Sequence, residues 1–226
     1  MKKIEQIDLG IISYNDALRR QQCCFEEIVA AKIRKETPDS DYWISCEHLP
    51  VITCGKHAKK EHLLLSEADL ALRGIELVAT DRGGDVTFHG PGQLVVYPIL
   101  DLEKYGLGLR AYIDLLEECV IRTLTDYDIV GERVTGAAGV WVEKGTVRER
   151  KICAIGVKSS RYVTMHGLAL NINTDLSCFS LIHPCGFTDK GVTSLMQETG
   201  IKHNLREVSE RLTKHASQLL ECDFFS

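Results

Sequence analysis

The chain has 226 residues, of which 44% are hydrophobic and 26% are charged, with only five prolines. This composition is typical of a globular protein with one sizeable core, and it argues against disorder. The net charge of -5 argues against nucleic acid as a general partner, because phosphate binding requires a basic face.

The apolar stretches and the cysteines favour the cytosol. The stretch Leu94 to Leu100 is far too short to span a bilayer, and the first ten residues contain no apolar run typical of a secretory signal. The nine cysteines are odd in number and form no C-x-x-C pair, so they indicate neither a zinc site nor a thioredoxin-type site. In a reducing compartment most of them are expected to be buried small hydrophobes. We therefore predict a cytoplasmic protein with no membrane partner.

Strands and helices are both expected up to residue 100. Apolar residues at helical intervals predict a helix over 14–36. A short helix is expected to begin after Ser66, which forms a capping-box pattern with Asp69, and to end at Gly74. The expected strands are 4–12, 41–48, 50–55, 76–80 and 93–100.

The second half of the chain is also expected to contain both helices and strands. One apolar face predicts a helix over 109–127, and two helices are expected to close the chain, over 192–199 and 203–221. The strands expected between them are 139–143, 151–160, 162–166 and 167–173. The order lacks the regular alternation of a doubly wound parallel sheet. We predict an α+β fold in a single domain over 1–226, with a mixed or antiparallel sheet packed by helices.

A glycine-rich segment, 80–93, follows one expected strand and contains four glycines and one proline between Arg82 and Gly92. Glycines let the backbone approach a ligand closely, and Arg82 and His89 add polar anchors. The same residues are compatible with a wide hairpin loop. The spacing matches neither the dinucleotide-binding nor the P-loop fingerprint, so a phosphate-binding loop has little support.

The expected strand that begins near residue 150 carries two reactive side chains. In a regular strand Lys151, Cys153 and Ile155 share one face. A lysine on a sheet face usually points to water. If Lys151 points into a site instead, its partly desolvated ammonium can lower the pKa of a nearby thiol or accept its proton. Cys153 is then a rival nucleophile.

Cys185 follows Pro184 in a loop, shortly before a helix expected to start near Thr188 or Asp189. A rigid turn beside a helix N-terminus can favour a thiolate. Cys178 lies in the same loop without that setting. The sequence contains no G-x-S-x-G, H-E-x-x-H or EF-hand pattern, so cysteine chemistry is the best remaining route.

Taken together, the chain closely resembles the octanoyl-carrier-protein:protein octanoyltransferase family. The resemblance rests on the motifs RGGDVTFHGPGQ, GVWV followed by KICAIG, HGLALNIN, DLSCF and PCGF, which occur in the family's order within 47–195. It implies the fold shared with lipoate-protein and biotin-protein ligases, in which a mixed sheet has helices on one side.

The resemblance also implies roles for individual residues. It places the acyl-thioester nucleophile at Cys185 and the lysine that activates this thiol at Lys151, not at Lys158. The expected acyl pocket consists of Arg82, Gly83, Gly84, Asp85, Val86, Thr87, Phe88, His89, Ala154, Ile155, Gly156, Gly167, Leu168 and Ala169.

The reaction implied by the resemblance moves an octanoyl or lipoyl group from acyl carrier protein to a lysine of a lipoyl domain. The expected acceptors are the lipoyl domains of 2-oxoacid dehydrogenases and the glycine cleavage H protein. Because the donor is already a thioester, neither ATP nor a metal nor another cofactor is expected. A monomer is expected.

Three alternatives stay open. An ATP-dependent lipoate-protein or biotin-protein ligase of the same fold needs no cysteine, whereas the PCG cysteine and the HGPG continuation favour the transferase. An amidotransferase between lipoyl-type proteins takes an amide-bound donor, and a non-catalytic module binds acylated carriers without turnover. Acylation of Cys153 or Cys178 also stays open. Finally, the basic segment 55–62 is either a solvated turn or a docking patch for an acidic carrier protein.

Overall fold

The computed structural model describes residues 2–36, 40–183 and 190–225. Its larger sheet has nine strands in the order β12-β1-β2-β6-β10-β9-β8-β7, with β11 paired to β9. The strands at its centre are antiparallel, and β1 runs parallel to both of its neighbours. The bounds are β1 Lys3–Ile12, β2 Asp41–His48, β6 Gln93–Ile99, β7 Glu132–Val134, β8 Ala137–Val142, β9 Arg150–Ser160, β10 Val163–Asn171, β11 Gly191–Val192 and β12 Asp223–Phe225.

A second sheet of three strands lies beside the first. Its order is β4-β3-β5, with β3 at Val51–Cys54, β4 at Glu76–Ala79 and β5 at Val86–His89. The strands expected at 41–48 and 50–55 both form, but the chain passes from the larger sheet to the smaller one at Pro50. The glycine-rich segment is thus no simple hairpin loop, since β5 lies within it and pairs with β3.

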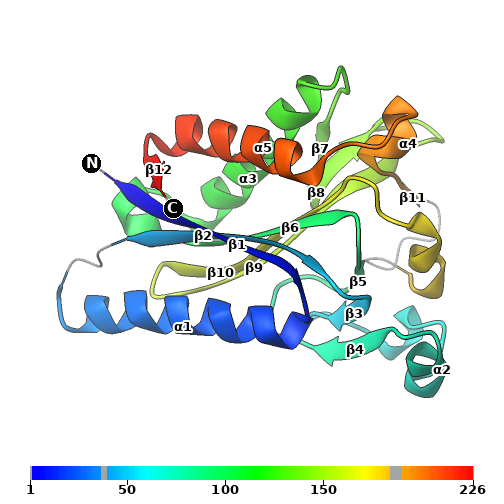
Figure 1. Cartoon of the computed structure of the whole chain (residues 1–226), viewed down its shortest axis with the longest axis horizontal. Coiled ribbons are helices and arrows are strands. Elements are labelled where there is room, and N and C mark those ends of the chain that lie inside the picture. The colour runs from blue at the N-terminus through cyan, green and yellow to red at the C-terminus, as the bar shows by residue number, and fades with distance from the viewer. Residues whose placement is uncertain (1, 37–39, 184–189, 226) are drawn as a thin grey trace.

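Helices cover both faces of the larger sheet (Figure 1). The long helices are α1 Tyr14–Ile33, α3 Leu109–Thr125 and α5 Leu205–Leu220, and the short ones are α2 Glu67–Leu72, α4 Leu195–Thr199 and the 3-10 turns η1 Lys60–His62, η2 Leu102–Tyr105 and η3 Leu176–Leu181. Helices α3 and α5 pack on one face, and α1 packs on the other. The predicted α+β fold is confirmed, but the expectation of helices on one side is wrong. Within the described ranges, no helix is both long and apolar enough to cross a bilayer.

The central strand β6 explains why both faces need cover. All seven of its residues are buried. Leu94 and Val96 contact the core under α3 and α5, whereas Val95 and Tyr97 contact the core under α1. A strand that is apolar on both faces is stable only between two layers of side chains.

Helix α1 forms as its sequence pattern predicts. The Ser13 side chain accepts a hydrogen bond from the backbone of Asp16 and caps the N-terminus. The residues buried along one face are Tyr14, Ala17, Gln21, Cys24, Ile28 and Ala31. They recur every three or four positions, so one stripe of the helix faces the sheet.

The strands expected at 162–166 and 167–173 form one strand, β10, which passes through His166 with a φ of 61°. The next residue must be glycine, because a Cβ on Gly167 would lie 2.0 Å from the carbonyl oxygen of Val96. Gly167 therefore lets β10 pack closely on β6 beside the site described below.

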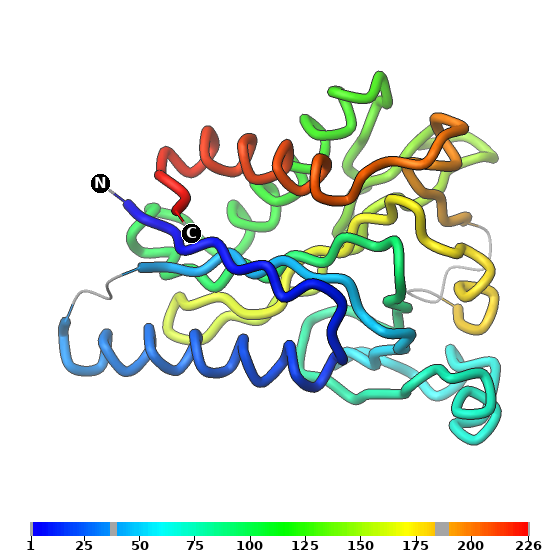
Figure 2. Tube along the Cα trace, viewed as in Figure 1, coloured from blue at the N-terminus to red at the C-terminus, as the bar shows by residue number. Residues whose placement is uncertain are grey.

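The two ends of the chain lie side by side (Figure 2). β1 pairs in parallel with β12, with Lys3 opposite Asp223. The C-terminal strand thus extends the larger sheet at the edge far from the site.

Candidate active site

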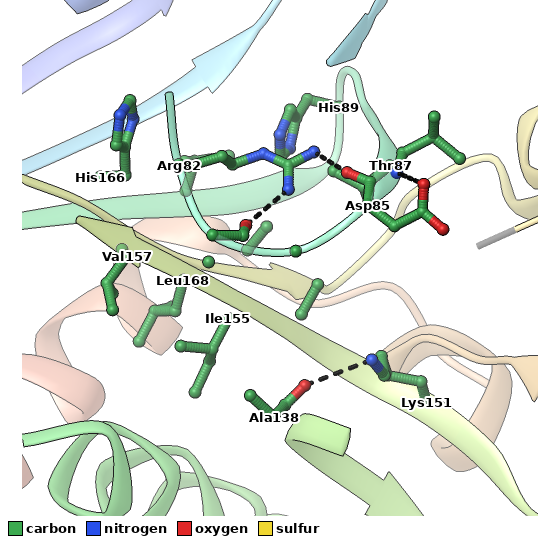
Figure 3. Close-up of a pocket in the computed structure, with 18 of the residues that line it drawn as sticks. Arg82, Asp85, Thr87, His89, Ala138, Lys151, Ile155, Val157, His166 and Leu168 are labelled. Carbon is green, nitrogen blue, oxygen red and sulfur yellow. Dashed lines mark hydrogen bonds between the residues drawn. The ribbon is translucent and has the colours of Figure 1, made fainter. Parts of the chain in front are cut away.

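A cavity of about 440 Å³ opens between the glycine-rich segment and the centre of the larger sheet. In Figure 3, Ile155, Val157 and Leu168 lie on the sheet side, and Arg82 and Asp85 lie across from them. Of the residues expected to form the acyl pocket, those that line the cavity are Arg82, Gly83, Gly84, Asp85, Val86, Thr87, His89, Ala154, Ile155, Gly156, Gly167, Leu168 and Ala169.

Phe88 does not line the cavity, which corrects its expected place in the pocket. Its side chain packs into the core of the smaller sheet, with its ring 5.7 Å from that of Phe179 in an edge-to-face contact. Side chains alternate along a strand, so Thr87 and His89 face the cavity while Phe88 points to the opposite side.

Arg82 is an internal anchor of the glycine-rich segment. It is buried, and its guanidinium donates to the Thr53 carbonyl at 2.8 Å, to the Asp85 carbonyl at 2.7 Å and to the Gly83 carbonyl at 3.0 Å. Three carbonyls held by one planar group define the course of the segment. Arg82 thereby shapes the wall of the cavity.

The same segment lies directly on strand β9. The amide of Gly83 donates to the Val157 carbonyl at 3.0 Å. A Cβ on Gly156 would lie 2.8 Å from the Gly83 carbonyl oxygen, so only glycine fits there. Gly83 and Gly156 thus allow the backbone of the glycine-rich segment to lie directly against the backbone of β9 beside the cavity.

His89 is a buried neutral group. Its Nδ1 lies 2.7 Å from the Gln93 side-chain oxygen, which can only accept, so Nδ1 donates. Burial lowers the pKa of His89 to about 3. Its ring stacks on that of Tyr14 at 6.2 Å. A histidine with this pKa does not act as an acid or base near neutral pH. His89 therefore contributes a neutral polar side chain to the wall of the cavity.

Lys151 lines the cavity beside Ala138, at the end away from His166 (Figure 3). Its Nζ donates to the Ala138 carbonyl at 3.2 Å and lies 4.6 Å from the ring centroid of Trp141. Trp141 is buried and its indole N–H donates to the Ala137 carbonyl. A carbonyl and an aromatic face both stabilise an ammonium, so Lys151 is oriented at the edge of an apolar cavity.

A bulge separates Lys151 from Cys153. In the pairing of β8 with β9, Val140 is opposite Cys153 and Trp141 is opposite Lys151, which leaves Ile152 as an extra residue. Lys151 lines the cavity, whereas Cys153 is fully buried in the core. The expectation that the two side chains share one face is therefore wrong.

The rival thiols are poorly suited to ionise. Burial raises the pKa of Cys153 to about 12. Cys178, on η3, is partly buried, and this burial also raises its pKa. Because the thiolate is the nucleophile, neither cysteine is favoured at neutral pH.

Cys185 lies outside the described residues, which stop at His183 and resume at Lys190. The chain on either side is anchored beside the cavity. The amide of His183 donates to the His62 carbonyl at 2.9 Å, and Val192, which lines the cavity, is the register partner of Lys151. Both anchors tie the described flanks of the 184–189 segment to elements of the site.

The helix expected to follow Cys185 begins later than predicted. Thr188 and Asp189 lie outside the described residues, but Gly191 and Val192 form β11 rather than a helix. The following amide, of Thr193, donates to the Lys151 carbonyl at 2.9 Å. Because these backbone groups pair with β9, they are not available for helical hydrogen bonds. Helix α4 starts only after its N-cap at Ser194. Among the described residues, no helix begins where a helix dipole would be needed to stabilise the Cys185 thiolate.

Other residues line the cavity without having been expected there. They are Tyr14, Gln93, Val95, Tyr97, Leu109, Ile113, Gly136, Ala137, Ala138, Val157, His166, Asn171, Phe179 and Val192. Gln93, Val95 and Tyr97 had a usable sequence signal, because they share one face of a buried strand. Among the described residues, no cluster of three His, Cys, Asp or Glu side chains has the geometry to hold a metal ion.

The lipoyl protein ligase A/B catalytic domain family matches residues 13–217, a range that includes every residue around the cavity. The chain belongs to this family. Its fold agrees with that of a bi-partite lipoate protein ligase from Thermoplasma acidophilum, with a TM-score of 0.72 at 17% identity over 100% of this chain and 86% of that chain. A biotin protein ligase from Aquifex aeolicus has a TM-score of 0.54 at 14% identity, over 98% and 71% of the two chains.

Curated relatives with much higher sequence identity indicate the class of enzyme within this family. An octanoyltransferase of Parabacteroides distasonis is 53% identical over 94% of this chain and 96% of its own length. An octanoyltransferase of Bacteroides fragilis is 55% identical over 91% of this chain and 92% of its own length. This kinship is with acyltransferases, and it agrees with the motifs found in the sequence.

Proposed function

We propose that the chain transfers an octanoyl or lipoyl group from the thioester of acyl carrier protein to a lysine of a lipoyl domain, through an acyl thioester on Cys185. The observation that supports this best is the apolar cavity with Lys151 at its edge. A cavity of a few hundred cubic ångströms suits a short acyl chain. Each methylene buried in it contributes about 0.8 kcal/mol.

In the proposed reaction, Lys151 takes the thiol proton of Cys185 or stabilises its thiolate. The sulfur attacks the donor carbonyl, the new C–S bond forms, and the carrier thiol leaves with a proton. The neutral amine of the acceptor lysine then attacks this acyl-enzyme and gives its proton to Lys151. The amide C–N bond forms, the C–S bond breaks and the Cys185 sulfur leaves as a thiolate. Because the donor thioester is already activated, the cycle needs no ATP.

The proposal also includes the partners and the place of the reaction. The acceptors are lipoyl domains of 2-oxoacid dehydrogenases and of the glycine cleavage H protein, and the enzyme works in the cytoplasm as a monomer. The family resemblance is the basis of these assignments, and the octanoyltransferases at more than 50% identity support the transfer reaction on which they depend.

Intact-mass analysis after incubation with octanoyl-acyl carrier protein, without ATP, tests the mechanism. We expect an octanoyl adduct on Cys185 that hydroxylamine removes and that a lipoyl domain discharges. The Cys185→Ser variant should form no thioester, and full transfer activity in that variant would defeat the proposal. Modification of the lipoyl domain only with ATP and free octanoate would instead identify a ligase.

A further inference from the structure

The segment 55–62 is a charged surface that the proposed chemistry does not use, and we call it the basic loop. It connects β3 to α2, and within it Lys56, His57, Lys59 and Lys60 are exposed. Its single acidic residue is Glu61, whose carboxylate lies 3.7 Å from Nζ of Lys59 in an exposed pair. On a chain of net charge -5, this loop is a local reversal of sign.

The first half of the basic loop is fastened to the wall of the cavity. Three successive amides donate to the glycine-rich segment, from Gly55 to the Asp85 carbonyl at 3.1 Å, from Lys56 to the Arg82 carbonyl at 3.0 Å and from His57 to the Gly84 carbonyl at 3.0 Å. The approach is close, since a Cβ on Gly55 would lie 2.4 Å from the Gly84 carbonyl oxygen. The loop therefore has a defined position beside the acyl site.

The second half of the basic loop is fastened to the chain that leads to Cys185. Nδ1 of His62 lies 2.5 Å from the Asp85 carboxylate, and the His62 carbonyl accepts from the amide of His183 at 2.9 Å. Just beyond, the Leu64 amide donates to the Leu181 carbonyl at 3.1 Å. The basic loop thus joins the cavity wall to the residues directly before the proposed nucleophile.

We infer that the basic loop is the docking surface for the acidic face of the carrier protein that delivers the acyl thioester. The inference rests on the proposed function. An acidic partner is repelled by a negatively charged enzyme except where the sign reverses, so it is steered to this loop. The donor's acyl group sits on a long prosthetic arm, so the carrier surface must dock at some distance from the sulfur. The exposed lysines meet that requirement, because they lie outside the cavity lining on a loop that is hydrogen-bonded to the cavity wall.

The test is a charge reversal with a matched control. One variant carries Lys56→Glu, Lys59→Glu and Lys60→Glu. The control carries Lys144→Glu, Lys202→Glu and Lys214→Glu, which make the same change of charge at exposed positions outside the basic loop. For each protein, the acylation kinetics of octanoyl-acyl carrier protein are compared with those of octanoyl-pantetheine, which lacks the protein.

We expect the loop variant to raise the KM for octanoyl-acyl carrier protein at least tenfold at low salt, and the control to raise it by less than threefold. The difference should shrink at high salt, because screening weakens attraction between exposed charges. Rates with octanoyl-pantetheine should agree with the unmodified enzyme. Equal effects in both variants, or an altered KM for the lipoyl domain alone, would overturn the inference.

Direct binding of acyl carrier protein, measured by titration calorimetry, keeps the two proposals separate. If the unmodified chain binds the carrier and the loop variant does not, the inference holds even where no acyl transfer occurs, and only the proposed function fails. If both bind the carrier equally, the basic loop is a solvated turn.

Discussion

Lys151 and Lys158 lie on the same strand but have different neighbours. Nζ of Lys151 lies at the cavity, against the ring of Trp141. Nζ of Lys158 is 2.5 Å from the Asp81 carboxylate and 5.5 Å from the ring centroid of Phe25. The two lysines therefore offer a matched pair for testing the proposed proton transfer.

Replacing Lys151 with alanine should lower kcat/KM for octanoyl transfer by two to four orders of magnitude, as for loss of a general base. The apparent pKa for alkylation of the Cys185 thiol should rise, because no ammonium stabilises its thiolate. Lys158→Ala should change both quantities only a few-fold. The rate of iodoacetamide labelling of Cys185 against pH, read by peptide mapping, measures the effect. An unchanged pH profile in Lys151→Ala would contradict the assigned role.

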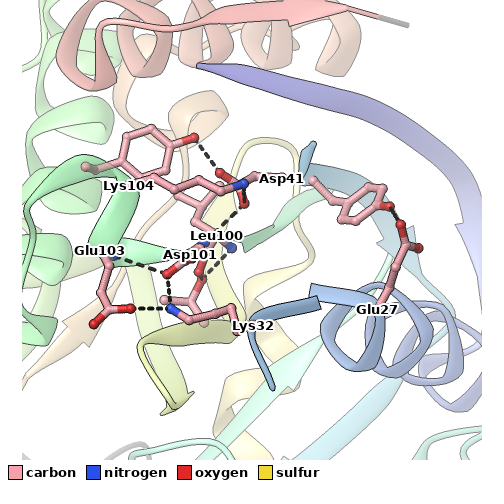
Figure 4. A network of polar contacts seen from close by, with 10 residues as sticks. Glu27, Lys32, Asp41, Leu100, Asp101, Glu103 and Lys104 are labelled. Carbon is pink, nitrogen blue, oxygen red and sulfur yellow. Dashed lines mark hydrogen bonds and ion pairs between the residues drawn. The ribbon is translucent and has the colours of Figure 1, made fainter. Parts of the chain in front are cut away.

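At the scale of elements, a partly buried network of charges joins the end of α1 to η2 (Figure 4). Nζ of Lys32 pairs with Asp101 and, at 2.6 Å, with Glu103. The side chain of Asp101 is only 7% exposed. Beside it, Asp41 at the start of β2 accepts from the Tyr105 hydroxyl at 2.7 Å. The network fastens the end of α1, on one face of the larger sheet, to η2, which leads from β6 to α3 on the other face.

Removal of the Lys32 charge should destabilise the fold without touching the site. Lys32→Met leaves the buried Asp101 carboxylate without this cation, and we expect a loss of about 2 kcal/mol in the free energy of unfolding. Arg34→Met breaks the exposed pair with Glu36 and should cost less than about 1 kcal/mol. Urea unfolding compares the two, and equal losses would show that the buried network is not what holds these elements together.

The elements themselves were largely predictable, because their signals are local. The cap at Ser66 and the apolar stripe of α1 act within a few residues, and both appear as expected. The errors came where distant strands intervened. Gly191 and Val192 pair with β9 rather than start a helix, and an extra residue at Ile152 turns Cys153 into the core.

At the scale of the whole molecule, buried histidines link stability to pH. Burial lowers the pKa of His89 to about 3 and that of His48 to about 4. In the unfolded chain both gain a proton near pH 6.5. Below that pH the unfolded state binds more protons than the folded state, so the free energy of unfolding falls as the pH falls.

The two histidines should each remove about 2 kcal/mol of stability when the pH drops from neutral to 5. The free energy of unfolding, measured with urea at each pH, should therefore decline between pH 6.5 and 5. In His89→Gln the decline should be clearly less steep, since one of the buried histidines with a lowered pKa no longer titrates. The same slope in that variant and in the unmodified chain would contradict the assignment.

By itself, the sequence determined the class of fold, most helices and strands, the family and about half of the cavity lining. Periodicity and capping act over a few residues, and the glycine-rich, KICAIG and HGLALNIN motifs are contiguous in the chain. Tertiary structure alone decided the division into two sheets, the helices on both faces and the inward course of Arg82. It also decided that Phe88 faces a core and that the basic loop adjoins the cavity. Each of these depends on contacts between segments far apart in the chain, and no local pattern encodes them.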